Sequence, residues 1–427
     1  MTMGGASNAR APESNPVAVT QVLVVGTGLA GLAAALALAT SGVAVVLAGP
    51  KPTPSGGQPR DTRSTALFGP SVGMLEAVGV FDALRSVAVP LTGLRLIDDT
   101  RSLWRAPEVL FEAGEIGLEA FGMNVENVDL LQALAERCSA APAIRWIDTT
   151  ATTFAFDHDH VRVGLADGQT IAARLVVGAD GAASACRAAA GIATDTWRYP
   201  QTAIATRFRH SRPHGGVSTE LHRRAGPLTT VPLAGPWSSL VWVETPDEAQ
   251  RLMACDDAAF TGELEARVGD VVGAVTAVGP RAAFPLSGVV ADPLGQRRIA
   301  LVGEAGHRLP PIGAQGLNLG LRDAAWLADI VSNAVAAGGD PGGDEVLAAY
   351  TAARRGDVTS RAVAVDVLNR SLLAGMLPVD VARGAGLAAL KSLGPLRRLV
   401  MREGVAPSGT LPRLMQVPPS LAVCGSP

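Results

Sequence analysis

The sequence predicts an α/β fold of two interleaved lobes, followed by a helical segment. An apolar strand at 22–25 leads through a glycine-rich turn into an Ala/Leu helix at 29–40, which is typical of the first unit of a parallel sheet. Short β-rich runs between 202 and 244 are separated by Pro, Gly and Arg, which favours a second, antiparallel sheet. Helical periodicity then covers 345–373 and 379–401.

The length of the chain supports more than one lobe, because it has 427 residues and single hydrophobic cores stop growing near about 250–300 residues. We assign the discontinuous stretches 20–100, 145–195 and 285–335 to the lobe with the parallel sheet. The antiparallel lobe takes 101–144 and 196–284, and the helical segment takes 336–406. We expect a disordered leader at 1–19, which is polar, and a loose tail at 407–427, where periodicity is lost.

The N-terminal βαβ unit is completed by a second apolar strand at 43–47. No charged residue occurs in 14–50, so hydropathy alone could indicate a membrane span. Glycines divide this run into strand, turn, helix, turn and strand. None of these pieces approaches the ~20 uninterrupted apolar residues that a span needs, and we therefore predict a parallel sheet here.

Three further runs at 153–156, 161–165 and 170–177 predict a small antiparallel meander that returns to the parallel sheet. His158 and His160 lie at a turn of this meander, and an exposed polar hairpin tip explains them without a metal. The four cysteines are scattered without a CxxC pair, which argues against a disulfide framework or a zinc site and fits a reducing cytoplasm. We predict no metal site.

A phosphate-binding motif occupies the first strand-to-helix turn. Gly26-x-Gly28-x-x-Gly31 follows a strand and opens a helix, and this context favours a dinucleotide pyrophosphate site over a tight turn without a ligand. The second strand normally ends in an acidic residue that binds the ribose hydroxyls. Here that position falls at Ala48 or Gly49, so ribose binding is weakened or supplied elsewhere.

The stretch 303–318 runs from a short buried strand, through a Pro/Gly loop, into a helix. Pro310 and Pro311 hold the chain extended, and Gly313 and Gly316 let the backbone approach a ligand closely. The helix directs the positive end of its dipole toward whatever the loop holds. A reduced, anionic isoalloxazine ring would suit that field.

A second strand-to-helix turn carries Gly-Ala-Asp-Gly-x-x-Ser-x-x-Arg at 178–187, with Ser184 placed to cap the helix. This segment resembles the signature of the para-hydroxybenzoate-hydroxylase-like, single-component FAD-dependent monooxygenases, and 303–318 resembles another motif of that family. The resemblance implies a Rossmann-like FAD-binding lobe and an antiparallel substrate lobe. It also implies that Asp180 lies near the flavin pyrophosphate and the nicotinamide route, and that Glu304, where Asp is usual, contacts the ribitol chain.

Within that superfamily the chain most resembles the ubiquinone-biosynthesis hydroxylases, from about residue 22 to 409. Four further stretches carry the resemblance: Asp61-x-Arg63-Ser64-Thr65-Ala66-Leu67, Tyr199-Pro200-Gln201-Thr202, Gly226-Pro227-Leu228 and Tyr350-x-x-x-Arg354-Arg355-x-Asp357. The resemblance implies that Arg63 lies over the flavin and that the region 199–242 forms the sheet covering the substrate.

The motifs and the resemblance together give a set of expected flavin contacts. They are Gly26, Gly28, Gly31, Arg63, Asp180, Gly181, Gly303, Glu304, Pro311, Gly313, Gln315, Gly316 and Asn318. The chemistry is assigned to the flavin, and the catalytic residue is left unknown. His307 is a weak catalytic candidate, because an isolated histidine in such a loop more often stabilises the loop.

The resemblance implies an aromatic-ring hydroxylase that uses FAD, NAD(P)H as a transient co-substrate and O2 on a polyprenylated phenol in ubiquinone biosynthesis. The net charge of −3 provides no basic field for nucleic acid. We expect a cytoplasmic protein. Apolar positions and Arg397-Arg398 in the C-terminal helices leave three interpretations open: peripheral contact with the inner face of the membrane, contact with partners in a quinone-biosynthesis complex, or plain packing onto the FAD lobe.

Two alternative functions remain at this point. One is an FAD-dependent reductase, epoxidase or halogenase acting on another apolar substrate, which the 199–242 stretch disfavours. The other is a non-catalytic flavoprotein scaffold, which the departures at Gly49, Glu304 and Gly306 make plausible. Bound yellow flavin and substrate-stimulated NAD(P)H oxidation in the purified protein distinguish the enzyme from the scaffold.

Overall fold

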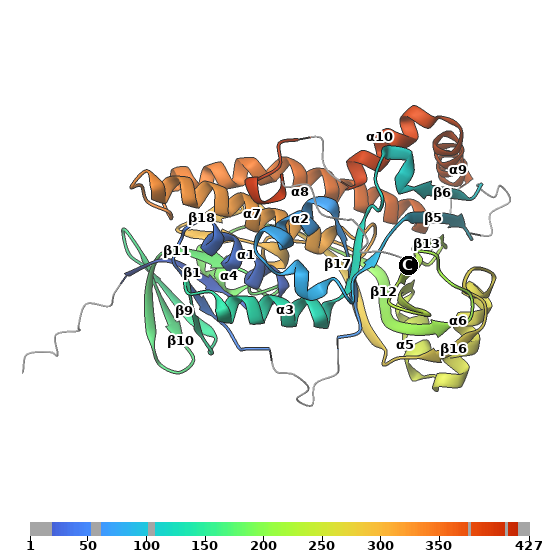
Figure 1. Ribbon diagram of the computed structural model, residues 1–427, viewed down its shortest axis with the longest axis horizontal. Helices are drawn as coiled ribbons and strands as arrows, with labels where there is room; N and C mark the ends of the chain where they lie inside the picture. Colours follow the sequence, from blue (N-terminus) through green and yellow to red (C-terminus); the bar gives the residue numbers. More distant parts are fainter. Residues whose placement is uncertain (1–18, 53–60, 101–106, 375–376, 406–408, 417–427) are drawn as a thin grey trace, which may run out of the picture.

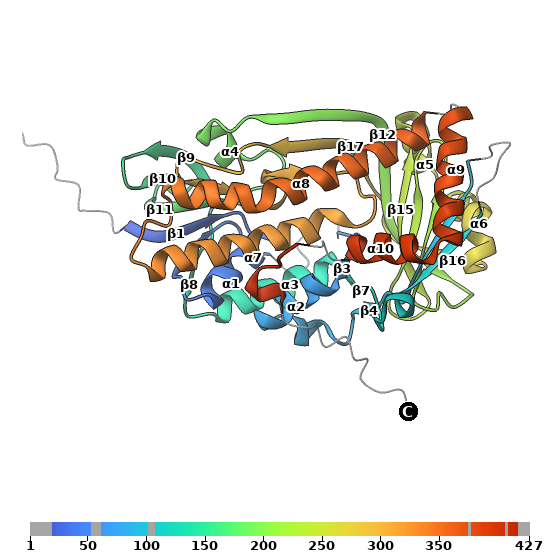
Figure 2. The same cartoon turned by 90° about the horizontal axis from the view of Figure 1, so that it is seen from above.

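Two sheets at opposite ends of the molecule organise the fold (Figure 1). The structure is a computed structural model, and it describes residues 19–52, 61–100, 107–374, 377–405 and 409–416. Two long antiparallel strands, β12 (Thr194–His210) and β17 (Ala282–Ala291), run from one lobe into the other and pair along their lengths (Figure 2). The predicted α/β class with two interleaved lobes is confirmed.

The first lobe is built on an eight-stranded sheet with the order β18-β19-β11-β1-β2-β8, extended beyond β11 by β10 and β9. Strands β19, β11, β1, β2 and β8 are parallel. Val22, Leu23 and Val24 of β1 are fully buried, because helices cover both faces of such a sheet. The strand bounds are β1 (Val19–Val25), β2 (Val45–Ala48), β8 (Ile144–Ile147), β9 (Ala151–Phe156), β10 (Val161–Leu165), β11 (Thr170–Gly178), β18 (Gly295–Gln296) and β19 (Ile299–Leu301).

Helices of this lobe pack closely because their contact faces carry small residues. Ala33, Ala34 and Ala37 of α1 are fully buried, and α1 contacts both α3 and α7. Helix α7 begins at Gln315, within the stretch 303–318 that was predicted to run into a helix, and it packs on α8. The helix bounds are α1 (Leu29–Thr40), α2 (Gly69–Ala77), α3 (Asn127–Ala140), α4 (Ala185–Ala190), α7 (Gln315–Ala336) and α8 (Asp344–Leu373).

The second lobe is built on a nine-stranded sheet with the order β20-β17-β12-β15-β14-β13-β5-β6, and β16 pairs with β12. A small sheet of β3, β7 and β4 accompanies the two large sheets. The remaining strand bounds are β3 (Ser64–Phe68), β4 (Val89–Pro90), β5 (Gly93–Asp98), β6 (Val109–Glu112), β7 (Gly122–Glu126), β13 (Val217–His222), β14 (Leu228–Pro232), β15 (Trp237–Glu244), β16 (Val275–Val278) and β20 (His307–Arg308).

Two expected lobe boundaries differ from this arrangement. Strand β5, which was assigned to 20–100 of the first lobe, pairs in parallel with β13 in the second lobe. Helix α3, which was assigned to 101–144 of the second lobe, buries Leu130 and Leu134 in the core of the first. The first insertion of the second lobe therefore begins and ends earlier in the chain than sequence patterns indicated.

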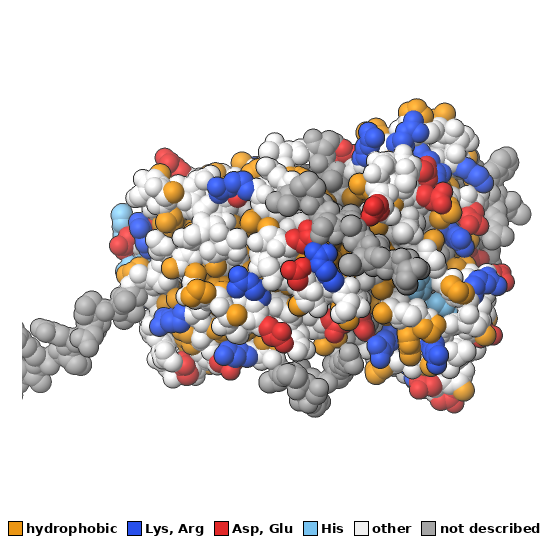
Figure 3. Space-filling view, in the orientation of Figure 1, with side chains coloured by type: hydrophobic (Ala, Val, Ile, Leu, Met, Phe, Trp, Pro, Cys, Tyr) orange, Lys and Arg blue, Asp and Glu red, His pale blue; other side chains and the backbone are white. Residues whose placement is uncertain are grey.

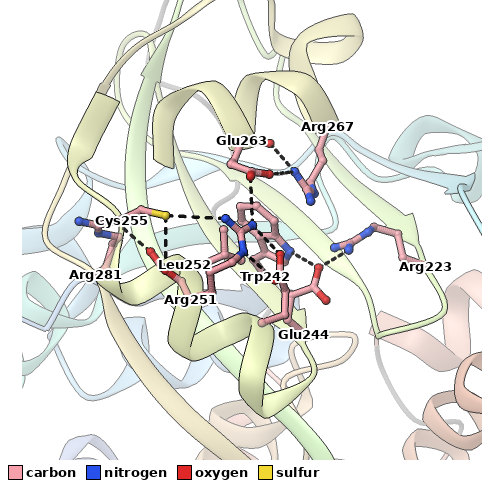
Figure 4. A network of polar contacts seen from close by, with 10 residues as sticks. Arg223, Trp242, Glu244, Arg251, Leu252, Cys255, Glu263, Arg267 and Arg281 are labelled. Atoms are coloured by element: carbon pink, nitrogen blue, oxygen red, sulfur yellow. Dashed lines mark hydrogen bonds and ion pairs between the residues drawn. The ribbon is translucent and has the colours of Figure 1, made fainter. Parts of the chain in front are cut away.

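The outer face of the second sheet is covered by α5 (Pro246–Ala254) and α6 (Asp257–Val272). Trp242 of β15 is fully buried, donates its indole N–H to Glu244 (3.0 Å) and lies under the Arg267 guanidinium (Figure 4). Arg267 also pairs with Glu263, and Arg223 pairs with Glu244. These contacts hold the helices and a loop to one face of the sheet, which leaves its other face available to form a cavity.

The C-terminal segment differs from expectation in two ways. The predicted helix at 379–401 is two helices, α9 (Leu377–Ser392) and α10 (Gly394–Val405), because Pro395 cannot continue a preceding helix. Part of the expected loose tail, 409–416, is held: Met415 is buried and Arg413 pairs with Asp329 (2.9 Å).

The terminal stretches 1–18 and 417–427 lie outside the described residues, so the expected leader and the end of the expected tail are not described. Among the helices that the structure describes, none combines the length and the apolar character required to cross a bilayer.

Candidate active site

A cavity of about 2120 Å³ lies between the lobes. One part of its wall consists of the N-terminal ends of α1 and α7 and the loop before α7; the other part is the inner face of the nine-stranded sheet together with α10. The cavity is therefore continuous from the two helix N-termini of the first lobe to the C-terminal helices.

The turn after β1 is packed so tightly that only glycine fits at two of its positions. A Cβ on Gly31 would lie 2.0 Å from the Gly26 carbonyl oxygen, and a Cβ on Gly26 would lie 2.3 Å from the Ala179 carbonyl oxygen. Gly28 is the N-cap of α1 and makes no side-chain cap. The first N–H groups of α1 are thus left for an anion at the cavity wall.

The missing acid at the end of β2 has a steric explanation. A Cβ on Gly49 would lie 2.6 Å from the Thr27 methyl group and 2.8 Å from its hydroxyl. Thr27 is fixed there because its hydroxyl donates to the Pro50 carbonyl (2.7 Å). Thr27 therefore occupies the space that a side chain at position 49 would need.

The Asp180 carboxylate forms hydrogen bonds with the start of α4. It accepts hydrogen bonds from the Ser184 hydroxyl (2.6 Å) and the Cys186 N–H (3.0 Å). The predicted cap at Ser184 is confirmed, since its oxygen accepts from the Arg187 N–H. Gly181 lies in the cavity wall, whereas Asp180 supports that wall from behind.

Arg63 is held at the cavity by a bidentate pair with Asp61, at 2.9 and 2.8 Å, and it lies over the Phe284 ring. Asn127 of α3 donates to the same carboxylate (3.4 Å). Burial alone would raise the pKa of Asp61, but the hydrogen bonds and charge of Arg63 outweigh it and hold that pKa below its ordinary value. The guanidinium is thereby fixed in orientation while nearly half of the Arg63 side chain stays exposed.

The loop before α7 presents backbone to the cavity. Gly303 (φ +62°) and Gly313 (φ +64°) both adopt left-handed conformations that favour glycine. Ala314, at φ +52°, caps α7 without a side-chain hydrogen bond, so the first N–H groups of this helix are also left for a ligand. Gln315 braces the loop by donating to the Gly313 carbonyl and accepting from Arg361, both at 2.8 Å.

Asn318 is fully buried and all of its amide hydrogen-bonding groups are used within the protein. Its nitrogen donates to the carbonyls of Ala66 (2.8 Å) and Ala314 (2.7 Å). Its oxygen accepts from the Phe68 N–H (3.0 Å) and the Ser71 hydroxyl (2.7 Å). The side chain thus ties α7 to β3 and α2 and gives the loop a fixed position.

His307 lies in a buried ionic cluster. Its Nε2 is 2.5 Å from the Asp323 carboxylate, which also accepts from Arg354 (2.7 Å) and from the Gly303 N–H (3.1 Å). Burial would raise the pKa of Asp323, but the charges of His307 and Arg354 hold it below its ordinary value. This geometry gives the imidazole a role in positioning the loop.

The predicted flavin contacts, together with the weak catalytic candidate His307, divide into two groups. The cavity wall includes Gly28, Arg63, Gly181, Gly303, Glu304, Pro311, Gly313, Gln315 and Gly316. The described wall does not include Gly26, Gly31, Asp180, His307 or Asn318, and the contacts above place these five in packing and loop support.

Sequence reasoning missed the α3 side of the cavity and named no individual residue on the sheet face. Gln132 and Glu136 of α3 line the wall, and the buried Leu130, Leu134 and Cys138 at helical spacing would have indicated that helix. Along β13 and β14, alternate residues such as Glu220 and Thr229 face the cavity. The period of two in those runs could have identified this face.

The described residues fit FAD. Two helix N-termini without side-chain caps meet one cavity, as a pyrophosphate and an electron-rich ring require. A Cβ added to Gly28, Gly181 or Gly316 would meet nothing within 4 Å, so the backbone there is open to a ligand. The fold and this cavity define a dinucleotide-binding oxidoreductase with a separate lobe over its substrate.

The FAD binding domain family matches residues 19–365, and the chain belongs to this family. FAD is its cofactor, and the chain is an FAD-dependent monooxygenase. The predicted family resemblance is confirmed by two relatives. Ubiquinone hydroxylase UbiL of Rhodospirillum rubrum is 39% identical over 406 residues, with 93% of each chain covered. The 3-demethoxyubiquinol 3-hydroxylase of Escherichia coli is 32% identical, covering 90% of this chain and 97% of that protein.

Solved structures share the fold at lower identity. The p-nitrophenol 4-monooxygenase PnpA of Pseudomonas putida superposes with a TM-score of 0.72 at 21% identity, covering 92% of this chain and 99% of that one. Klebsiella pneumoniae HpxO, solved with FAD and uric acid, gives 0.69 at 18% identity, covering 91% and 98%.

Proposed function

We propose that this monooxygenase hydroxylates the aromatic ring of a polyprenylated phenol in ubiquinone biosynthesis, with NAD(P)H and O2 as co-substrates. The observation that carries the proposal is the apolar extension of the cavity, which continues from the cofactor end along the sheet to α10. A small polar phenol would not need that length. The names of the two relatives, a ubiquinone hydroxylase and a demethoxyubiquinol hydroxylase, agree with such a substrate.

Bound FAD supplies the redox chemistry, and the chain binds and orients the reactants and excludes water from the reaction site. In this proposal the first turn of α1 holds the pyrophosphate, and Gly26 and Gly31 keep that turn against β11. Arg63 and the loop from Gly303 to Gly316 hold the ring system from two sides. Because the loop includes Leu309, Pro310 and Pro311 in the wall, it also limits water at the reacting end.

The prenyl tail would lie along the apolar part of the cavity. Strands β5 and β6 contribute Leu94, Leu96 and Phe111 to the wall, and α10 contributes Met401 and Val405. Burial of apolar surface is the main source of affinity for such a chain. The tail would leave the ring at the sheet and end beneath the C-terminal helices.

We also propose a cytoplasmic protein with peripheral contact at the inner face of the membrane. The segment 377–405 carries five basic and two acidic residues, a net charge of +3 in a chain with a net charge of −3. Leu393, Leu396, Leu399 and Val400 are exposed on or next to α10, and Figure 3 shows apolar and basic side chains together over this helix. This combination is typical of a surface that binds anionic lipid.

The decisive experiment is mass spectrometry of the quinone-pathway lipids in a strain that lacks the gene. We expect a prenylated phenol short of one ring hydroxyl to accumulate and the mature quinone to fall, with both restored by the wild-type gene. A normal quinone profile in the deletion strain would refute the substrate. Purified protein without flavin and without phenol-stimulated NAD(P)H oxidation would instead support the scaffold alternative.

A further inference from the structure

The part of the nine-stranded sheet that lines the cavity carries an acidic side chain, Glu220 of β13. Among the described residues that line the cavity, Glu220 of β13 is the only acid from this sheet. It is 6% exposed, and its neighbours in register on the adjoining strands are Thr229 and Leu96. An acid in such a wall carries a desolvation cost unless a partner offsets it.

Glu220 has one close partner and spare capacity. One carboxylate oxygen lies 2.8 Å from His222 Nε2, and the other is at the limit of hydrogen bonding, 3.5 Å from the Thr229 hydroxyl. A carboxylate offers about four lone-pair sites, so the second oxygen can accept from a donor in the cavity. His222 is also buried, and its Nδ1 has no partner among the described residues. This pair is not used by the cofactor contacts described above.

Glu220 lies on the same face of the sheet as Ser239, which contacts β3, the strand that follows Arg63. It lies in the same row as Thr229 and Val241. Ser239 lies two residues from Val241 along β15, about 7 Å by strand geometry, and contacts Ser64 of β3 at 2.6 Å. Ser64 follows Arg63, and Arg63, Ser239 and Glu220 all line the same cavity. A phenol placed between the flavin and this sheet can therefore extend to Glu220.

We propose that Glu220 is a catalytic base that accepts the proton of the substrate's phenolic hydroxyl, an inference that rests on the proposed function. As a ring carbon forms its bond to one oxygen atom of O2, the O–O bond breaks with electrons that NAD(P)H supplies through the bound flavin, and the other oxygen atom leaves as water. Electron density then leaves the phenolic oxygen, and its O–H becomes strongly acidic. That O–H bond breaks, its electron pair stays on the substrate, and the proton passes to the free oxygen of Glu220. His222 is a positioning residue, because its hydrogen bond fixes the other oxygen. The ligand class is a phenol with its hydroxyl directed at β13.

The kinetic test uses the holoenzyme with two substrates, ortho-octylphenol and a difluorinated octylphenol. The assay pH is chosen so that the difluorinated phenol is already ionised in solution and ortho-octylphenol is not. Glu220→Gln should lower hydroxylated product by about a hundredfold with the first substrate, while phenol-stimulated NAD(P)H oxidation continues. The ionised phenol needs no base, so it should recover most of the wild-type rate. Equal losses with both substrates, or no loss, would overturn the role of Glu220. If the wild-type enzyme hydroxylates neither phenol, the proposed function itself fails, and this inference with it.

Two further measurements separate chemistry from structural damage. The wild type should bind ortho-octylphenol about tenfold more tightly than its methyl ether, because only the phenol donates to a carboxylate; Glu220→Gln should reduce this preference below about threefold. An unchanged preference would contradict the contact. Glu248→Gln, in helix α5 on the outer side of the same sheet and away from the cavity wall, is the matched control. For His222, the Gln variant should keep product formation and the Leu variant should lose it, and equal activity of the two would refute positioning.

Discussion

At the scale of single residues, Thr27 and Gly49 act as one unit. A Cβ atom at position 49 would clash with the Thr27 side chain, and the Thr27 hydroxyl is held by a hydrogen bond to the Pro50 carbonyl. The absence of the ribose acid is thus part of a local packing solution, and restoring an acid alone should not improve FAD binding.

We expect Gly49→Glu to weaken FAD binding and to destabilise the protein by about 1–3 kcal/mol, the usual cost of overpacking. The double variant Thr27→Ala with Gly49→Glu removes the conflicting methyl and hydroxyl and should bind FAD more tightly than Gly49→Glu does. Titration of each apoprotein with FAD, followed by flavin fluorescence, measures the FAD affinity of the two variants and of the wild type. Tighter binding by the single variant than by the wild type would contradict the steric explanation.

The second residue-scale prediction concerns Asp180. Its two hydrogen bonds, to Ser184 and the Cys186 N–H, stabilise the first turn of α4. Asp180→Ala should lower the free energy of unfolding by about 0.5–2 kcal/mol, as for other lost caps, and Asp180→Asn should lose less because its oxygen still accepts. Urea denaturation of the FAD-free proteins provides the measurement. If Ala and Asn variants are as stable as the wild type, the carboxylate has no capping function.

At the scale of elements, a buried ionic cluster joins β20, α7 and α8. Asp323 of α7 meets His307 of β20 and Arg354 of α8. Asp357 of α8 meets Arg354 and Arg322. The loop before α7 lies between β20 and α7, so the cluster that joins these elements determines where the loop lies.

Asp357→Asn should remove about 3–5 kcal/mol of stability, the range for breaking a buried ion pair on one side. Burial raises the pKa of Asp357, but the charges of Arg354 and Arg322 outweigh it and leave the pKa well below its ordinary value. The folded-state pKa is depressed, so this stabilisation is complete above the unfolded-state pKa of about 4 and is lost as pH falls through the folded value. The stability difference between wild type and variant, measured by denaturation, should therefore shrink only in acid. A difference that persists unchanged in acid would exclude the ion pair as its cause.

The elements that the sequence predicted well are those whose signals are local. The helix at 29–40 and the strand at 161–165 have the expected bounds, because turn residues and periodicity are read over a few positions. Strand β5 was placed in the wrong lobe because its partner, β13, lies more than a hundred residues away. Pro395 was a local signal that the sequence analysis overlooked, because it indicates that the predicted helix at 379–401 is divided in two.

The site shows the same division. The motif glycines were found because their backbone geometry is demanded by adjacent residues. Glu220 was not singled out, because its meaning depends on a cavity that three distant parts of the chain enclose. Asn318 was found for its position in a motif, yet its hydrogen bonds join α7 to β3 and α2, which no local pattern indicates.

At the scale of the whole molecule, the cavity and the exposed face of α10 lie on two sides of the same helix. Met401 is buried and Val405 faces the cavity, while Leu396 and Leu399 are exposed on the other side. Arg397 is held by Glu115. A helix with an inner face toward the substrate and an apolar, basic outer face would let a lipid-soluble phenol pass from a bilayer into the cavity.

The double variant Leu396→Glu with Leu399→Glu should therefore reduce binding to vesicles containing anionic lipid by more than about tenfold, since each buried Leu contributes about 1.5–3 kcal/mol. Co-sedimentation measures binding, and added salt should weaken the wild-type interaction through screening. Val19→Glu changes an exposed apolar residue on β1 and should bind like wild type. Flavin content and turnover of a short-chain phenol should be unchanged in all variants, because these side chains lie outside the cavity wall. Equal vesicle binding by wild type and double variant would locate the membrane contact elsewhere.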